Sequence, residues 1–297
     1  MSIRHCADRV IVLSAALRLQ YTGFMIRVAV LQMVSTNNRD ENLAVAADLI
    51  QQAAEDDAKL LLLPENFSFM GQNEHDKVAL REKPGSGPVQ DFLQQQAKHH
   101  GLWLIGGTVP LTASVPDKIR AASLLYNPDG ECIARYDKIH LFDVHVKSGG
   151  DDTYNESGTI EGGDEIIVAR TPIGKIGLSV CYDLRFPELY RSMHSHDVNI
   201  FAVPAAFTAT TGKAHWEVLL RSRAIENLCY LLASNQSGEH VNKRRTWGHS
   251  MIVNPWGEVL AVVERDTGFA CADIDLQQLE KLRGSFPALK HCKPDIY

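Results

Sequence analysis

Short apolar runs alternate along this chain with segments whose apolar residues recur at helical spacing. Ile26–Met33 is a β-branched apolar run, and Asn42–Ala54 carries apolar residues at helical spacing on a polar background. The same order returns with an apolar run over Leu60–Pro64 and a helical pattern over Val89–His100, which ends near Gly101. The alternation predicts strands that are connected by crossover helices.

Turn sequences between other apolar runs predict hairpins. Asn127-Pro128-Asp129-Gly130 separates Ser123–Tyr126 from Cys132–Tyr136, and Thr171-Pro172-Ile173-Gly174 leads into Lys175–Val180. Further predicted elements are strands over Leu102–Val109, Val198–Pro204, Tyr230–Asn235, Gly248–Asn254, Val259–Val263 and Gly268–Ile274, with helices after Asp183 and over Lys213–Leu228. Hairpins together with crossover helices imply mixed sheets, and two such sheets packed face to face inside helices would satisfy the pattern.

The domain organisation is simple from Met25 onwards. No Pro- or Ser-rich linker and no repeat divides residues 25–297, so we predict one domain there. Residues 1–24 differ, because Val10–Leu19 is apolar and has arginines around it. Asp8 and the lack of a small-residue cleavage site argue against a targeting peptide. We interpret residues 1–24 as an N-terminal extension or as the product of a start site assigned too far upstream.

Composition and charge exclude several classes of protein. Of the 297 residues, 45% are hydrophobic and 22% are charged, as in an ordinary globular protein. A formal net charge of -6 without a Lys/Arg block gives no support for nucleic-acid binding. No apolar run has the length of a membrane span, and six cysteines without paired spacing predict reduced thiols in the cytoplasm. The sequence contains no phosphate loop, dinucleotide fingerprint or metal-ligand spacing, so we expect neither cofactor nor metal.

Cys181 is a candidate nucleophile at a predicted strand-to-helix turn. It follows the strand Lys175–Val180, and a turn of this kind brings a thiol close to N–H groups that lower its pKa and can hold an oxyanion. Ser179 would project to the same side and is a rival nucleophile, although the G-x-S-x-G elbow is absent. An inert buried cysteine is the other interpretation.

Two charged residues also follow predicted strands. Glu65 ends the run Leu60–Pro64, where a carboxylate that leaves a buried sheet can act as a general base. Lys138 lies in Arg135–Leu141, where a fixed ammonium among apolar neighbours can stabilise an oxyanion. Taken singly, Glu65 could instead be a helix N-terminal acid or a solvated loop residue, and Lys138 could be a surface lysine. His140 offers a Cys–His pair as an alternative.

The combination of these residues resembles the nitrilase, or carbon–nitrogen hydrolase, superfamily. The motifs are Leu63-Pro64-Glu65, Tyr136-Asp137-Lys138-Ile139-His140-Leu141 and Cys181-Tyr182-Asp183-Leu184-Arg185-Phe186-Pro187-Glu188. The resemblance implies an α/β fold, a four-layer α-β-β-α sandwich with mixed sheets, and a metal-free triad of Glu65, Lys138 and Cys181. It further implies a second glutamate at Glu156 and an oxyanion contact from the backbone N–H of Tyr182.

Other motifs resemble the deaminated glutathione amidase branch of this superfamily. They are Lys138–Val144, Pro204–Thr208, Thr211–Glu217, Arg223–Asn227 and Trp247–Met251. This implies hydrolysis of a small ω-amide and a homodimer or larger homo-oligomer. The related ω-amidases that act on α-ketoglutaramate are one alternative, and an inactive binding module with the same fold is another.

Three residues are candidates for contacts with the substrate. Arg185 could bind a substrate carboxylate through a bidentate pair, or could instead form an ion pair with Glu188 or Asp183. Phe207 and Thr208 could line the pocket, although aromatic residues near a helix start often serve packing.

Overall fold

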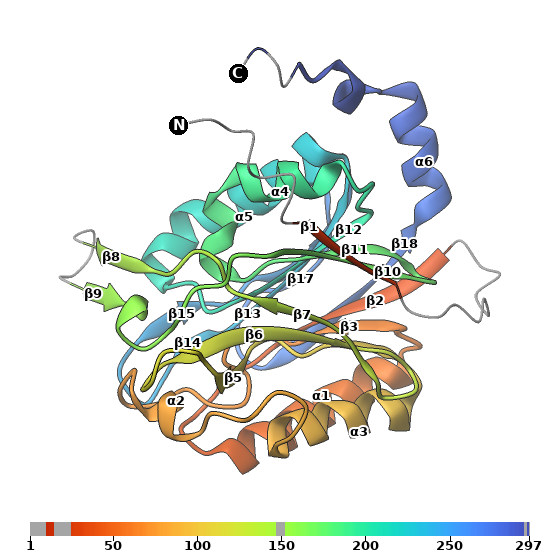
Figure 1. The fold of residues 1–297 in the computed structure, drawn as a ribbon. Coiled ribbons are helices and arrows are strands. Elements are labelled where there is room, and N and C mark those ends of the chain that lie inside the picture. Colours follow the sequence, from red (N-terminus) through yellow and green to blue (C-terminus); the bar gives the residue numbers. More distant parts are fainter. Residues whose placement is uncertain (1–9, 15–24, 147–151, 294–295, 297) are drawn as a thin grey trace.

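Two seven-stranded sheets lie face to face, and helices cover the outer face of each sheet (Figure 1). The computed structural model of the chain describes residues 10–14, 25–146, 152–293 and 296. The layers follow the order helix, sheet, sheet, helix, which confirms the α-β-β-α sandwich with mixed sheets implied by the sequence motifs.

The first sheet combines parallel and antiparallel neighbours. It consists, in spatial order, of β1 (Val10–Ser14), β10 (Ile166–Thr171), β11 (Gly174–Leu178), β12 (Ile200–Ala205), β13 (Tyr230–Asn235), β16 (Ser250–Val253) and β17 (Val259–Val263). The strands β11, β12 and β13 run parallel, whereas β10–β11 and β16–β17 are antiparallel hairpins. The helices α4 (Pro187–His194) and α5 (Ala209–Asn227) cover this sheet.

The second sheet has the same mixed character. It consists of β18 (Gly268–Asp275), β2 (Met25–Gln32), β3 (Leu60–Leu62), β4 (Trp103–Ile105), β6 (Ile119–Tyr126) and β5 (Val109–Thr112), with β7 (Cys132–Asp137) also paired to β6. The helices α1 (Arg39–Glu55) and α3 (Pro88–His100) cover it.

Smaller elements connect and flank the two sheets. They are α2 (Asp76–Ala79), the ribbon of β8 (Asp143–Val146) and β9 (Asp152–Asn155), the ribbon of β14 (Ser237–Glu239) and β15 (Arg245–Trp247), α6 (Leu276–Ser285), and the 3-10 helices η3 (Glu156–Gly158), η4 (Cys181–Arg185) and η5 (Ala288–His291). None of the described helices is both long enough and apolar enough to cross a bilayer.

Burial on both faces explains why the strand sequences are continuously apolar. In β2, Val28 and Val30 belong to the core between the two sheets, whereas Ala29 and Leu31 belong to the core beneath α1 and α3. All four are fully buried. Since successive side chains of a strand point to opposite faces, a strand covered on both sides must be apolar at every position.

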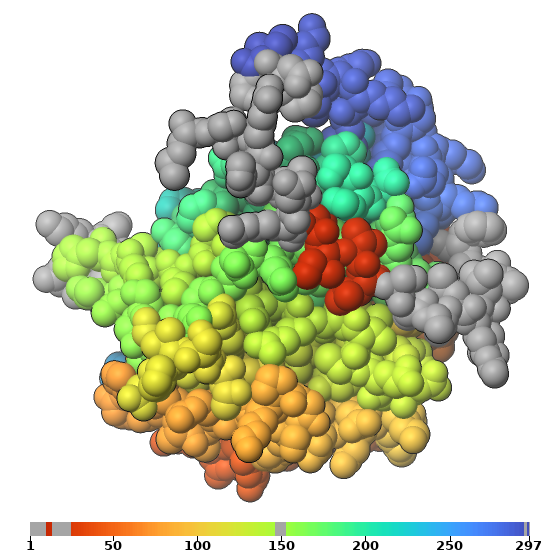
Figure 2. Space-filling view, viewed as in Figure 1, coloured from red at the N-terminus to blue at the C-terminus, as the bar shows by residue number. Residues whose placement is uncertain are grey.

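The sequence predicted most elements, and three differences have local causes. The bounds of β13 and β17 are as predicted, but the single strand predicted over Leu102–Val109 is wrong, because the chain turns between Ile105 and Val109. The helix predicted after Asp183 begins as the 3-10 helix η4 and becomes α-helical only at Pro187. Val10–Ser14, in the segment interpreted as an extension, forms β1, pairs in parallel with β10 and lies at the surface in Figure 2, where it is red.

The turn at Gly107 matters for the site because it supports the segment that carries Glu65. Gly107 has φ +48°, and a Cβ atom there would collide with the carbonyl oxygen of Pro64. Next to it, the hydroxyl of Thr108 accepts a 2.9 Å hydrogen bond from the N–H of Asn66. Only glycine allows both the left-handed backbone and this close approach.

Two left-handed glycines provide a test of this packing. Gly101 has φ +62°, but a Cβ atom there would meet nothing within 4 Å. We expect Gly101→Ala to lower the free energy of unfolding by about 1–2 kcal/mol through backbone strain alone. Gly107→Ala should lower the free energy of unfolding by ~1–3 kcal/mol more than Gly101→Ala does, because the added methyl group overpacks the turn. It should also reduce activity. Urea unfolding measures both values, and equal losses for the two variants would contradict this account.

Candidate active site

Three residues singled out in the sequence follow strand ends that face one another across the sandwich. Glu65 comes shortly after β3, Lys138 directly after β7, and Cys181 shortly after β11. The strands β3 and β7 belong to one sheet and β11 to the other. Polar side chains at these ends emerge where the backbone leaves the core, so the fold concentrates them between the sheets.

Lys138 forms the centre of a buried ionic cluster. Its side chain is fully buried, and its Nζ atom lies 2.9 Å from Oε1 of Glu65 and 2.8 Å from Oε2 of Glu156. Burial by itself favours the neutral amine, but the carboxylates of Glu156 and Glu65 outweigh it and raise the pKa of Lys138 well above its ordinary value. The ammonium therefore remains charged throughout the neutral pH range.

Glu156 is held from two sides. It begins η3, and its carboxylate accepts one hydrogen bond from Lys138 and another of 2.8 Å from the backbone N–H of Phe142. Although burial favours the protonated acid, the ammonium of Lys138 lowers the pKa of Glu156. Glu156, matched only loosely by the sequence motif, is thus an ionised partner of Lys138.

Cys181 occupies a strained turn. It is the first residue of η4 and has φ +50°, a left-handed conformation that is uncommon for a residue with a side chain. Burial and the negative charge of Glu65 raise the pKa of its thiol, and this outweighs the ammonium of Lys138. The expectation that the turn lowers the pKa is therefore wrong. The resting thiol is protonated, so a neighbouring base must remove its proton before it can react.

Ser179, the rival nucleophile, faces the core. Its hydroxyl donates to the carbonyl of Ala202 and lies 2.9 Å from the hydroxyl of Tyr190, and its side chain is buried. It is absent from the residues that line the pocket around Cys181. The hydroxyl is therefore engaged in connecting β11 to β12 and α4.

His140 is bound to a carboxylate rather than directed at the pocket. Its Nδ1 atom lies 2.7 Å from Oδ1 of Asp183, and its ring stacks on Phe186 with 3.7 Å between centroids. Asp183 is fully buried and also accepts hydrogen bonds from the hydroxyl of Tyr136 and the backbone N–H of Val180. This network connects the segment that carries Lys138 to the turn that carries Cys181.

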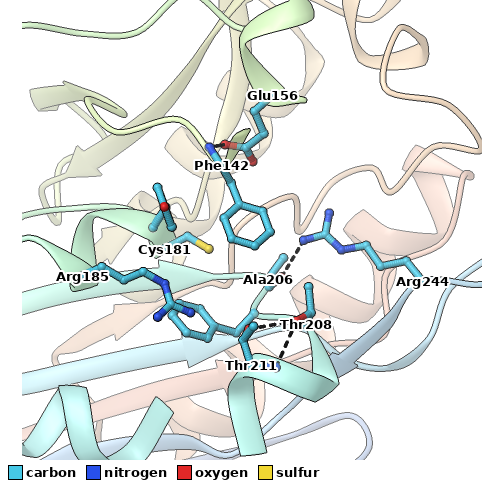
Figure 3. A pocket seen from close by; sticks show the side chains of 10 residues that line it. Phe142, Glu156, Cys181, Arg185, Ala206, Thr208, Thr211 and Arg244 are labelled. Carbon is cyan, nitrogen blue, oxygen red and sulfur yellow. Dashed lines mark hydrogen bonds between the residues drawn. The ribbon is translucent and has the colours of Figure 1, made fainter. Parts of the chain in front are cut away.

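The thiol of Cys181 opens into a small pocket that Figure 3 shows from close by. Its lining residues are Phe142, Glu156, Cys181, Tyr182, Arg185, Ala206, Phe207, Thr208, Thr211 and Arg244. Tyr182, Arg185, Phe207 and Thr208, all candidates from the sequence, are thus gathered around one cavity. Among the described residues, no group of His, Cys, Asp or Glu side chains has an arrangement that could hold a metal ion.

Arg185 contacts an imidazole and two aromatic rings. Its Nη1 atom lies 3.2 Å from Nδ1 of His215, and its guanidinium lies over the rings of Phe207 and Tyr182 at 5.3 and 5.8 Å. Among the described residues, no ion pair joins it to Glu188 or Asp183. Its charge therefore remains unneutralised at the edge of the pocket.

Sequence reasoning missed two important lining residues. Phe142 lies within the motif Lys138–Val144, and its ring packs edge-on to Tyr182 at 4.9 Å. Arg244 lies in the loop between β14 and β15, far along the chain from every catalytic motif. The only signal for it was the run of basic residues Lys243-Arg244-Arg245.

Comparisons with known proteins agree with this geometry. Residues 27–284 match the family model described as carbon-nitrogen hydrolase. Similar curated proteins include the deaminated glutathione amidase of Synechocystis sp., 42% identical over 266 residues, which cover 89% of this chain and 96% of that protein. Another is the human deaminated glutathione amidase, 40% identical over 273 residues, which cover 91% of this chain and 83% of that protein.

Solved structures show the same fold. The NitFhit protein of C. elegans has a TM-score of 0.83 at 36% identity, over 92% of this chain and 66% of that one. Nit3 of Saccharomyces cerevisiae, described as a member of the nitrilase superfamily, has a TM-score of 0.79 at 29% identity, over 89% of this chain and 94% of that one. Since the family model spans most of the chain and the curated relatives match nearly its full length, this chain belongs to the carbon–nitrogen hydrolase family and is an amidase.

Proposed function

We propose that this amidase hydrolyses the ω-amide of deaminated glutathione through a thioester on Cys181. In this proposal Glu65 is the general base, and Lys138 stabilises the oxyanion. The observation that supports these roles is the buried cluster of Lys138 with Glu65 and Glu156, next to a thiol that is protonated at rest. A neutral thiol requires a base, and a permanently charged ammonium provides a fixed positive charge for the transition state.

The first half of the reaction forms the acyl-enzyme. Glu65 takes the thiol proton while the sulfur of Cys181 bonds to the amide carbon, and the carbonyl electrons move onto oxygen. Lys138 and the backbone N–H of Tyr182 hold this oxyanion. When the oxyanion collapses, the C–N bond breaks, and Glu65 returns its proton to the leaving amine. The product amine departs and a thioester remains.

The second half releases the acid. Glu65 accepts a proton from water as the water oxygen attacks the thioester carbon, and the oxyanion is held as before. When the C–S bond breaks, Glu65 returns the proton to the sulfur of Cys181. Lys138 stays protonated in both halves because Glu156 and Glu65 raise its pKa. One carboxylate thus acts as base and acid in turn.

The names of the relatives and the positive edge of the pocket together support the choice of substrate. Deaminated glutathione carries a keto-carboxylate on its acyl half, and Arg185 offers an unneutralised guanidinium beside Phe207 and Thr208. The second candidate is α-ketoglutaramate, which has the same acyl half but releases ammonia.

We also infer a homodimer in the cytoplasm. Large apolar side chains on α5 and the β16–β17 turn are exposed, among them Val218 at 65%, Ile225 at 47% and Trp256 at 58%, which supports an interface between copies. The five cysteines in the described part of the chain, including the exposed Cys132, are unpaired, as is typical of a reducing compartment.

Product analysis tests both the nucleophile and the substrate. We expect the purified protein to convert deaminated glutathione to α-ketoglutarate and cysteinylglycine. Cys181→Ala should abolish this conversion without changing the melting temperature. Ser179→Ala should keep appreciable activity, because its hydroxyl serves packing, although the variant should be less stable by about 1–3 kcal/mol. If Ser179→Ala were inactive and Cys181→Ala active, the assignment of the nucleophile would be reversed.

A second pair of variants separates Lys138 from His140. Lys138→Met keeps the length of the side chain but removes the charge, so we expect kcat to fall by about 10²–10³-fold or more, the scale for losing an oxyanion donor. His140→Ala loses its contact with Asp183 and should lower kcat less, because the backbone N–H of residue 140 still reaches that carboxylate. Steady-state kinetics on folded protein decide the matter. An inactive His140 variant beside an active Lys138 variant would point to a Cys–His pair.

A further inference from the structure

The guanidinium of Arg244 is only partly satisfied by the described residues. Its Nη2 atom donates a 2.8 Å hydrogen bond to the carbonyl of Ala206, and its charge lies 5.2 Å from the ring of Tyr154. Among the described residues, its Nε–H is buried without an acceptor, and no carboxylate forms an ion pair with it. Buried donors in proteins are almost always satisfied by protein, water or a ligand, so this Nε–H is free to bind an acceptor that enters the pocket.

Arg244 forms part of the wall between two cavities. The pocket at Cys181 encloses about 10 Å³, whereas a neighbouring cavity of about 550 Å³ extends beyond it. Both are lined by Arg244 and Thr208. Along the described residues, the Arg244 side therefore offers room for a bulky group of a substrate attacked at Cys181.

The larger cavity is basic. Its charged lining residues are Lys243, Arg244, Arg245 and Glu74. The carboxylate of Glu74 lies 3.6 Å from the ammonium of Lys77, which does not line the cavity. Positive charge therefore predominates in the cavity. Burial by itself lowers the pKa of Arg244, but neighbouring negative groups, first of all Glu74, raise it above its ordinary value. The guanidinium is therefore always charged.

The two arginines of the pocket lie on different sides of the nucleophile. In Figure 3, Arg185 and Arg244 flank the space in front of Cys181 from opposite directions. An amide attacked by Cys181 has an acyl half and an amine half, and these extend in different directions from the reacting carbon. The two arginines therefore lie in different directions from the nucleophile, as the two halves of the amide do.

We propose that Arg244 binds a carboxylate on the leaving amine, so that the enzyme selects amides with an anionic group on both halves. This inference rests on the proposed function, because it assigns the keto-carboxylate to Arg185. It also separates the two candidate substrates. Cysteinylglycine, the amine released from deaminated glutathione, carries a carboxylate, whereas the ammonia released from α-ketoglutaramate carries none.

The test compares two substrates that differ only at the far end of the amine half. One is deaminated glutathione, and the other is its analogue with a neutral C-terminal carboxamide. We expect wild-type kcat/KM to be about ten- to a hundredfold lower for the carboxamide, as for loss of a charge-assisted hydrogen bond. Arg244→Gln should lower kcat/KM for the acid by a similar factor and for the carboxamide by less than about threefold.

Further variants show which contact is lost. Arg244→Lys should recover only part of the activity on the acid, because an ammonium cannot reproduce the guanidinium fork. Arg185→Gln should reduce kcat/KM for both substrates equally, since both retain the keto-carboxylate. Arg265→Gln removes an exposed positive charge from outside both cavities and should change neither value.

The outcomes distinguish this inference from the proposed function. Equal losses on both substrates in Arg244→Gln, or a wild-type enzyme that cleaves both equally well, would overturn the inference while the proposed function stands. A wild-type enzyme that cleaves α-ketoglutaramate but neither glutathione derivative would overturn the proposed substrate and this inference together.

Discussion

The active site depends on one buried ammonium. Lys138 is fully buried, and the carboxylates of Glu65 and Glu156, its ion-pair partners in the described part of the chain, compensate for the loss of hydration. Removing one partner of a buried ion pair typically costs about 3–5 kcal/mol, because the remaining charge is left unpaired. The three residues come from segments that follow β3, β7 and β9, so the cluster forms only when these segments are packed together. The interaction that can stabilise an oxyanion therefore also fixes the geometry around it.

A second buried carboxylate joins this cluster to the nucleophile. Asp183 accepts hydrogen bonds from Tyr136 in β7, from the backbone N–H of His140 after β7, and from the backbone N–H of Val180, which directly precedes Cys181. These bonds hold Cys181 in its left-handed conformation. Such support is needed because a strained residue persists only when the surrounding structure fixes it. Asp183 thus positions Lys138 and Cys181 relative to each other without lining the pocket.

Local patterns in the sequence predicted much of this structure. The strand at Tyr230–Asn235 has its predicted bounds because a strand buried on both faces has an unmistakable apolar run. The break after Ile105 was missed, because a pair of glycines is compatible with a strand end or a turn until the contact of Gly107 with Pro64 is known. The resemblance of the sequence motifs to the nitrilase superfamily identified Glu65, Lys138 and Cys181 as the residues of one site. The direction of the pKa shift of Cys181 depends on burial and on carboxylates that are near in space but distant in the sequence. The role inferred for Arg244 depends on two cavities that no local sequence pattern encodes.

The central claim is that the resting nucleophile is a neutral thiol served by a neighbouring base, not a thiolate paired with the ammonium of Lys138. The ultraviolet absorbance of the thiolate, recorded against pH as the difference between wild type and Cys181→Ala, tests this directly. Because burial and Glu65 raise the pKa of Cys181 above its ordinary value of 9.0, we expect no thiolate signal at neutral pH and its appearance only in strongly alkaline solution. A full thiolate signal at neutral pH, lost in Cys181→Ala, would contradict the account.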